Sequence, residues 1–282
     1  IDIRNNLTNY SGNVLTGGTY LLTAKLKVKN ADIVTNGGNI VLNGPDSKFL
    51  DDSNNNALAN LVTNTGGFTI MNDRDFTTKG DYANSGYVGI GTDSTLTVNG
   101  NYTQTAGKTQ LEDGTLETAS TSFNVYINGG ILTGNGTVNS SVISSGEVSP
   151  GDSPGTINIL GDYTQDATGL LTIELANLTD FDRLIISGNA NLAGTLSIKM
   201  LYGFAVSSGD EFVFLNCLNR TGKFDTENGL TAGLLDIFGV EYGTEYVKLV
   251  ALRNYSTVPE PSSTSALVFA LSGLVAYIRR KR

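Results

Sequence analysis

The chain contains no histidine, one cysteine and only five prolines among its 282 residues. Without histidine it cannot carry a Ser-His-Asp triad, a Cys-His pair or a histidine-ligated zinc or haem. Cys217 cannot form an internal disulfide, and its place in the apolar run EFVFLNCL predicts a small buried side chain. These absences exclude the commonest nucleophilic and metal-dependent active sites.

The surplus of Ala, Leu, Glu and Lys that is typical of helical proteins is also missing. Instead the chain holds 34 glycines, and runs of Asn, Ser and Thr separate short apolar stretches. This composition is typical of turn-rich β structure. Disorder is the alternative, but 39% hydrophobic residues, regularly placed, are enough to bury a core. We therefore predict an all-β protein.

Positive charge is scarce except at the C-terminal end. The net charge is −9; residues 256–282 hold four basic residues and one acidic residue, a net +3, which leaves −12 for residues 1–255. An acidic body repels phosphate backbones, so we expect no nucleic-acid partner. The chain begins at Ile1 without a signal-peptide pattern, and we expect a mature chain or a fragment of a longer one.

Residues 90–200 alternate apolar and polar side chains with a period of two, which predicts half-buried strands. A longer repeat is also present: LTVNGNYTQTAG (96–107) recurs as INILGDYTQDATG (157–169), with Tyr102 matching Tyr163 at a separation of 61 residues. Repeated short strands with irregular turns favour a parallel β-helix. Asn-Gly turns also suit hairpins, so an antiparallel β-sandwich stays open.

The rhythm changes twice along the chain. We predict β-helix repeats over residues 1–200, a C-terminal β cap over 201–255, where the apolar runs are longer, and a separate tail over 256–282.

The tail has three parts. Pro259 and Pro261 favour an extended, accessible element. The uncharged stretch Ser262–Ile278 has 17 residues, about 25 Å as a helix, slightly short of a membrane core of roughly 30 Å. We predict a single C-terminal hydrophobic helix there, with the body outside the membrane. The alternative, a buried core helix, fits poorly with a terminal cluster of four cations: Arg279, Arg280, Lys281 and Arg282.

This arrangement resembles the PEP-CTERM sorting signal of Gram-negative and related bacteria, with VPEPSS as the matching motif. The resemblance implies recognition by an exosortase, a membrane-embedded cysteine-dependent processing enzyme. It also implies removal of the tail near the motif and delivery of the body to the cell surface or extracellular matrix. The sorting motif consists of Val258, Pro259, Glu260 and Pro261. The LPxTG motif of Gram-positive sortase substrates is absent.

The body also resembles a known class of protein. GGILTGNGTVNSSVISSGEVSPGDSPGTINILGDYTQ (129–165) and the following segment 180–200 resemble the passenger-type β-helices of autotransporters and of many PEP-CTERM surface proteins. The resemblance implies a right-handed parallel β-helix that serves as a stalk or an adhesive surface. We expect a structural or adhesive protein of the cell surface or biofilm matrix, with extracellular polysaccharide as a candidate partner.

Parallel β-helices also host polysaccharide hydrolases, which need converging carboxylates. Adjacent residues of a strand point to opposite faces, and NDRDF favours a turn, so we expect no enzyme and no cofactor. A secreted carbohydrate-active enzyme is the alternative. The candidate pairs are Asp51/Asp52, Asp73/Asp75 and Glu112/Asp113. The oxygen-rich segments 225–229 and 149–155 lack EF-hand spacing and the GGxGxD repeat, so we expect no metal site.

Overall fold

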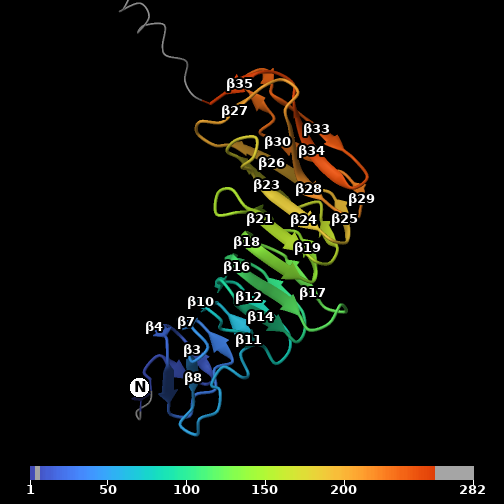
Figure 1. Ribbon diagram of the computed structural model, residues 1–282. Coiled ribbons are helices and arrows are strands. Elements are labelled where there is room, and N and C mark those ends of the chain that lie inside the picture. The colour runs from blue at the N-terminus through green and yellow to red at the C-terminus, as the bar shows by residue number, and fades with distance from the viewer. Residues whose placement is uncertain (4–6, 258–282) are drawn as a thin grey trace, which may run out of the picture.

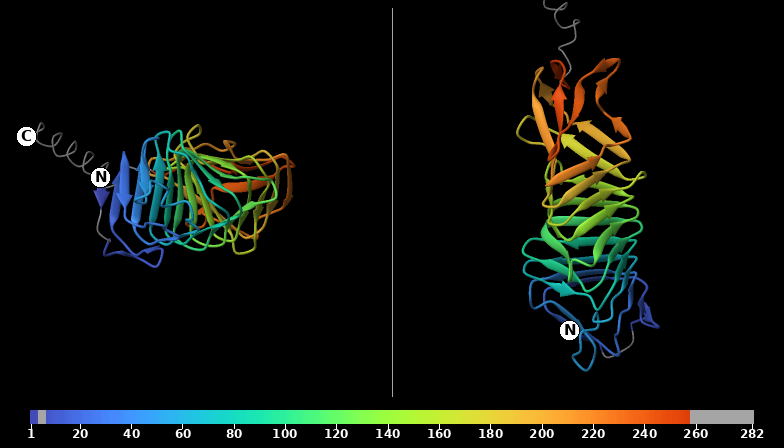
Figure 2. Two further views of the ribbon diagram at one scale, coloured as in Figure 1. Left: turned by 90° about the horizontal axis from the view of Figure 1, so that it is seen from below. Right: turned by 90° about the vertical axis from the view of Figure 1, so that its right-hand side faces the viewer.

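The computed structural model describes residues 1–3 and 7–257, and all regular structure in these residues is β. The chain winds in stacked coils, and the strands of successive coils pair in parallel (Figure 1). The column runs from the N-terminal coils at one end to the C-terminal strands at the other, as both views of Figure 2 show. This β-helix-like fold confirms the prediction of an all-β protein with long parallel sheets, and it excludes the antiparallel sandwich.

Three faces surround the interior. The strands of the first face are β4 (Thr19–Leu22), β7 (Asn39–Asn43), β10 (Gly67–Met71), β13 (Tyr87–Ile90), the first parts of β16 (Lys108–Thr118) and β18 (Ile131–Asn139), β20 (Glu147–Pro150), β23 (Leu170–Leu175), β26 (Thr195–Met200) and β30 (Thr226–Asn228). β16 and β18 continue around a corner into the second face, where β16 changes register between Glu112 and Gly114.

The second face begins with a separate three-stranded sheet at the N-terminal end. That sheet contains β1 (Asp2–Ile3), β5 (Lys25–Val28) and β8 (Lys48–Leu50). It is followed by β11 (Phe76–Thr77), β14 (Thr95–Val98), the second parts of β16 and β18, β21 (Thr156–Ile159), β24 (Arg183–Ile186) and β28 (Glu211–Asn216).

The third face is one sheet of 11 strands. Its parallel strands are β3 (Val14–Leu15), β6 (Thr35–Asn36), β9 (Thr63–Asn64), β12 (Tyr82–Asn84), β15 (Tyr102–Gln104), β17 (Asn124–Ile127), β19 (Ser141–Ser144), β22 (Tyr163–Gln165), β25 (Asn189–Leu192) and β29 (Asn219–Gly222). β2 (Tyr10–Ser11) pairs with β3 in the antiparallel direction.

The repeat that the sequence displays corresponds to whole coils. Tyr102 pairs in register with Val125, Val125 with Val142, and Val142 with Tyr163, so the two matching tyrosines lie three coils apart on the third face. Coil length varies widely, from 16 residues between Ile131 and Glu147 to 31 between Leu184 and Leu215. Because the strands stay in register, the extra residues of the longer coils lie in the corners between strands.

Inward-pointing side chains stack in columns that form the core. On the second face Leu96, Leu116, Val138, Ile159 and Ile186 are in register from coil to coil, and all are buried. Aromatic rings also fill the interior: Tyr82 and Tyr102 are buried and stack with ring centroids 5.9 Å apart. The burial of apolar area in every coil is the main stabilising contribution.

A ladder of amides lines one interior corner. Asn36 donates to Asn64 (2.8 Å), Asn64 to Asn84 (2.9 Å) and Asn84 to Gln104 (3.3 Å), through their side chains. All four side chains are buried and in register on the third face. Each amide therefore satisfies a buried polar group of the next coil, and each such bond contributes about 1 kcal/mol net.

The C-terminal end changes from parallel to antiparallel pairing. β28 pairs with β34 (Tyr246–Ala251), and β34 pairs with β33 (Phe238–Tyr242), both antiparallel. Two short antiparallel pairs complete this end: β27 (Ala205–Val206) with β35 (Tyr255–Ser256), and β31 (Thr231–Ala232) with β32 (Leu235–Asp236). Cys217 directly follows β28 and is 9% exposed, which confirms the predicted burial, and burial raises the pKa of its thiol.

Candidate functional site

An uncharged strip runs along the outside of the third face. At the outward position of each strand, in continuous register, the side chains are neutral from Thr35 to Thr221. The strip consists of Thr35, Thr63, Ala83, Thr103, Tyr126, Ile143, Thr164, Asn191 and Thr221. Residues 1–255 carry a net charge of −12, yet this row of outward side chains is free of charge.

One border of this strip is a second ladder, on the outside of the molecule. The Asp81 carboxylate accepts the backbone N–H of Asn101 (2.8 Å), and the Asn101 side chain accepts that of Asn124 (3.0 Å). Further along, Asp162 accepts the backbone N–H of Asn189 (2.7 Å). Each side chain thus satisfies the start of a strand in the next coil, which holds the strip in register.

An acidic hollow of about 210 Å³ lies at the corner between the first and second faces. Glu112, Asp113 and Asp152 contribute carboxylates to it, and its other lining residues are Thr92, Gln110, Leu111 and Asn135. The Tyr87 hydroxyl donates to Glu112 Oε1 (3.3 Å). Burial, and then the charge of Glu112, raises the pKa of Tyr87 to about 12, so this phenol stays protonated at neutral pH.

The sequence named two of these carboxylates as a candidate pair but did not predict that they would share a hollow. Glu112 and Asp113, which we expected to diverge, both line it, and Asp152 of the SPGDSPG segment joins them from a later coil. Asp113 has a φ of 65°, in the left-handed region, because it forms the turn between the two faces.

The other carboxylate pairs mostly support turns. Asp51 accepts the backbone N–H (2.7 Å) and the side-chain amide (2.8 Å) of Asn55, and the latter bond is the largest cause of its lowered pKa. Asp52 accepts the backbone N–H of Asn30 (3.0 Å). Asp75 accepts the backbone N–H of Thr95 (2.8 Å), and Asp73 has a φ of 61° in the predicted turn. The carboxylates of Asp51, Asp52 and Asp75 thus have a structural role, because each accepts a hydrogen bond from a backbone N–H group.

Asp182 was not identified from the sequence. Its side chain is fully buried, and its two oxygens accept the backbone N–H groups of Gly155 and Glu174, both at 2.8 Å. Burial raises the pKa of Asp182 to about 7, against the effect of these two hydrogen bonds. Through these two bonds Asp182 connects the loop that contains Asp152 and Gly155 with strand β23, which contains Glu174. DFDR carries no local signal of this role, because both partners lie elsewhere in the chain.

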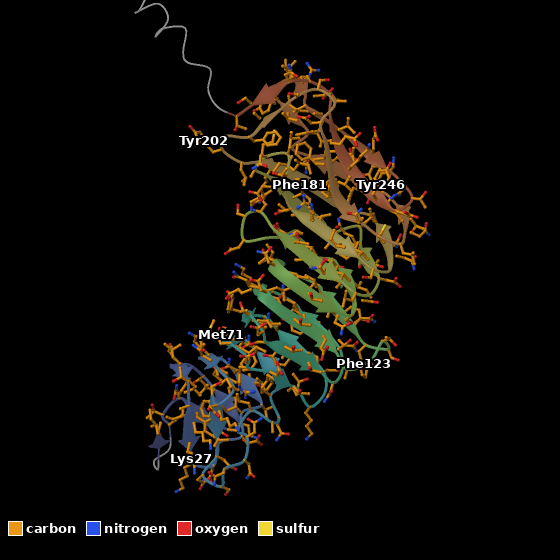
Figure 3. All side chains as sticks on the ribbon, in the orientation of Figure 1. Lys27, Met71, Phe123, Phe181, Tyr202 and Tyr246 are labelled. Atoms are coloured by element: carbon orange, nitrogen blue, oxygen red, sulfur yellow. The ribbon has the colours of Figure 1, made fainter. Side chains whose placement is uncertain are left out.

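A second hollow of about 240 Å³ is uncharged. It lies at the corner between the second and third faces, where five residues (119–123) join β16 to β17 but Ser140 alone joins β18 to β19. Figure 3 labels Phe123 on the longer corner. Hydroxyl groups of Thr118, Ser120, Thr121, Ser140 and Ser141 line it, next to Leu160, which is 52% exposed.

A third hollow, of about 280 Å³, is basic. It lies near the N-terminal end and is lined by Lys48, Leu50, Asn54, Asn56 and Arg74. Neither cation had been singled out from the sequence, because they lie on different coils.

The sorting motif Val258–Pro261, the hydrophobic stretch 262–278 and the basic cluster 279–282 lie outside the described residues. Among residues 1–3 and 7–257, no helix is long and apolar enough to cross a membrane. In the same residues, no group of three or more His, Cys, Asp or Glu side chains is placed to hold a metal ion.

No protein-family model matches the chain, and no curated protein matches its sequence.

Proposed function

We propose that the chain is an exported, non-enzymatic protein of the cell surface or extracellular matrix. In this proposal a right-handed parallel β-helix forms a structural or adhesive body. The C-terminal signal, with its motif at Val258–Pro261 and its hydrophobic helix at 262–278, directs that body to an exosortase-type enzyme. Before processing, the basic cluster 279–282 stays on the cytoplasmic side and the body lies outside.

The observation that carries the adhesive part of the proposal is the uncharged strip of the third face. It extends over nine successive coils and presents mainly hydroxyl and amide groups. Extracellular polysaccharides are rich in hydroxyl groups, which pair with such side chains without the desolvation of a charge. The geometry favours a long polymer over a small ligand because the strip is continuous.

The sorting part is supported by the order of motif, apolar stretch and basic cluster in the sequence. Its test is carried out in native cells that express the full chain. Replacing Pro259 and Pro261 together by Ala should prevent display of the body, measured by protease shaving of intact cells. A matched variant, Pro45→Ala, changes a proline in the body and should be displayed normally. Equal display of both variants would refute sorting through the motif.

A second candidate function, a secreted carbohydrate-active enzyme, is favoured by the acidic hollow alone. Its carboxylates Glu112, Asp113 and Asp152 would serve as acid and base. Under this alternative the purified protein releases reducing ends from polysaccharides, and Glu112→Gln abolishes the release. Under the adhesive proposal, neither protein releases any.

A further inference from the structure

We propose that the basic hollow binds the oxyanion groups of an acidic polysaccharide. The inference rests on the proposed surface function and specifies the chemistry of its partner. The anion would lie between the ammonium group of Lys48 and the guanidinium of Arg74, with the amides of Asn54 and Asn56 as further donors.

The first argument is that neither cation forms an ion pair with a carboxylate among residues 1–3 and 7–257. The ion pairs between described residues are those of Lys248 with Glu211 and Glu241. Lys48 and Arg74 therefore form none with the described residues, although the body has nearly twice as many acidic as basic residues. Lining residues other than the two cations are neutral.

The second argument is that the guanidinium of Arg74 is held in place and still has unused hydrogen-bond donors. Its Nε donates to the backbone oxygen of Ser47 (2.9 Å), and its Nη1 donates to the backbone oxygen of Asp75. These bonds fix the guanidinium in a half-buried position beside β8. Nε and Nη1 make the hydrogen bonds of this guanidinium to described residues, and Nη2 makes none. Burial lowers the pKa of Arg74, and the charge of Asp75 only partly offsets this effect. A held guanidinium with free donors is suited to carboxylate or sulfate groups.

The third argument is that cations are stacked here. Lys25 of β5 and Lys48 of β8 are directly in register on adjacent strands. Like charges in this arrangement repel each other, and an anion bound at the hollow would relieve the repulsion. Lys27, labelled in Figure 3, lies on the same strand as Lys25 at this end of the column.

The fourth argument is the distribution of charge along the column. Residues 1–80 contain seven basic and seven acidic residues, whereas residues 81–255 contain seven basic and 19 acidic residues. An acidic polymer is therefore repelled by most of the body and accepted at the N-terminal end. The contact would be local and would weaken with salt.

The test measures binding of the purified, surface-released protein to four polymers at low ionic strength. They are polygalacturonate (carboxylate groups), dextran sulfate (sulfate groups), neutral dextran and double-stranded DNA. We expect binding to one or both acidic polysaccharides, and the stronger of the two identifies the oxyanion. Lys48→Ala should weaken that binding about tenfold, the value of one charge-assisted hydrogen bond.

Two further variants complete the test. Lys48→Glu should abolish binding, and Arg74→Gln should weaken it with a cooperative unfolding transition retained. Lys223→Ala removes the same charge from an exposed position in the acidic part and should leave affinity unchanged. Equal losses from Lys48→Ala and Lys223→Ala, equal binding of neutral dextran, or equal binding of DNA would each overturn the inference.

The two proposals fail in different ways. Absence of binding by a protein that is correctly displayed refutes the basic hollow and leaves the surface function standing. If the purified protein binds but is never displayed on cells, the basic hollow stands and the surface function is refuted.

Discussion

Asn64 and Asn84 lie one above the other inside the column, 20 residues apart in sequence, with Asn64 Nδ2 2.9 Å from Asn84 Oδ1. Both are buried, and Asn64 also donates to the backbone oxygen of Tyr87 (2.9 Å). The pair therefore joins two successive coils through buried side chains.

Asn64→Ala should therefore destabilise the protein. The substitution removes the bonds that Asn64 donates to Asn84 and Tyr87 and the bond that it accepts from Asn36, and it opens a cavity, at a cost of about 3 kcal/mol. The measurement is the free energy of unfolding in denaturant. Thr103→Ala, on the outward side of the same sheet, should cost far less; equal losses for the two variants would contradict the role of the amide ladder.

The close approach of successive corners makes a second prediction. A Cβ at Gly86 would overlap the backbone oxygen of Gly66 in the preceding coil, whereas a Cβ at Gly80 would meet open space. Gly86→Ala should lower the free energy of unfolding by about 2 kcal/mol. Gly80→Ala serves as the matched control and should be neutral or slightly stabilising. Similar behaviour of the two variants would mean that the corners are less tightly stacked than described.

The raised pKa of the buried Asp182 carboxyl group predicts that the stability of the protein depends on pH. Its pKa rises from 3.8 to about 7 on folding, so between these values the folded protein binds a proton that the unfolded chain has lost. Its contribution to stability is therefore complete below about pH 4 and is lost as the pH rises through 7. The charges of Glu174 and Lys199 act on the group in opposite directions.

Comparison with Asp182→Asn isolates this effect. The unfolding free energy of the native protein minus that of the variant should fall by about 2 to 4 kcal/mol between pH 4 and pH 8. Thermal or denaturant unfolding at several pH values measures it. A difference that grows with pH would mean that the hydrogen bonds from Gly155 and Glu174 hold the carboxylate ionised in the folded state.

The uncharged strip makes a prediction about adhesion. Thr103→Glu combined with Thr164→Glu places two charges in the strip three coils apart, and both positions point outward. Adhesion of cells to matrix polysaccharide should fall severalfold, because each bound polymer would have to desolvate a carboxylate. Thr97→Glu on the second face is the control. Unchanged adhesion in the double variant would exclude the strip as the contact surface.

Local patterns in the sequence were sufficient for the strands but not for the corners. Period-two alternation placed strands such as β14, β23 and β26, and the match of Tyr102 with Tyr163 reflects an integral number of coils. The hollows lie where corners of different length follow one another along the column. Coil length varies too much for a fixed sequence repeat to predict the position of these hollows. Arg74 therefore meets Ser47, and Asp182 meets Gly155, without a local signal.

The central claim, export and sorting through the C-terminal signal, is tested most directly by the intact mass of the mature protein from the native cell surface. The same measurement is made on cells that lack the processing enzyme. The account predicts that the residues beyond the Val258–Pro261 region are missing only when the enzyme is present. A mass that includes the chain through Arg282 in both strains would contradict it.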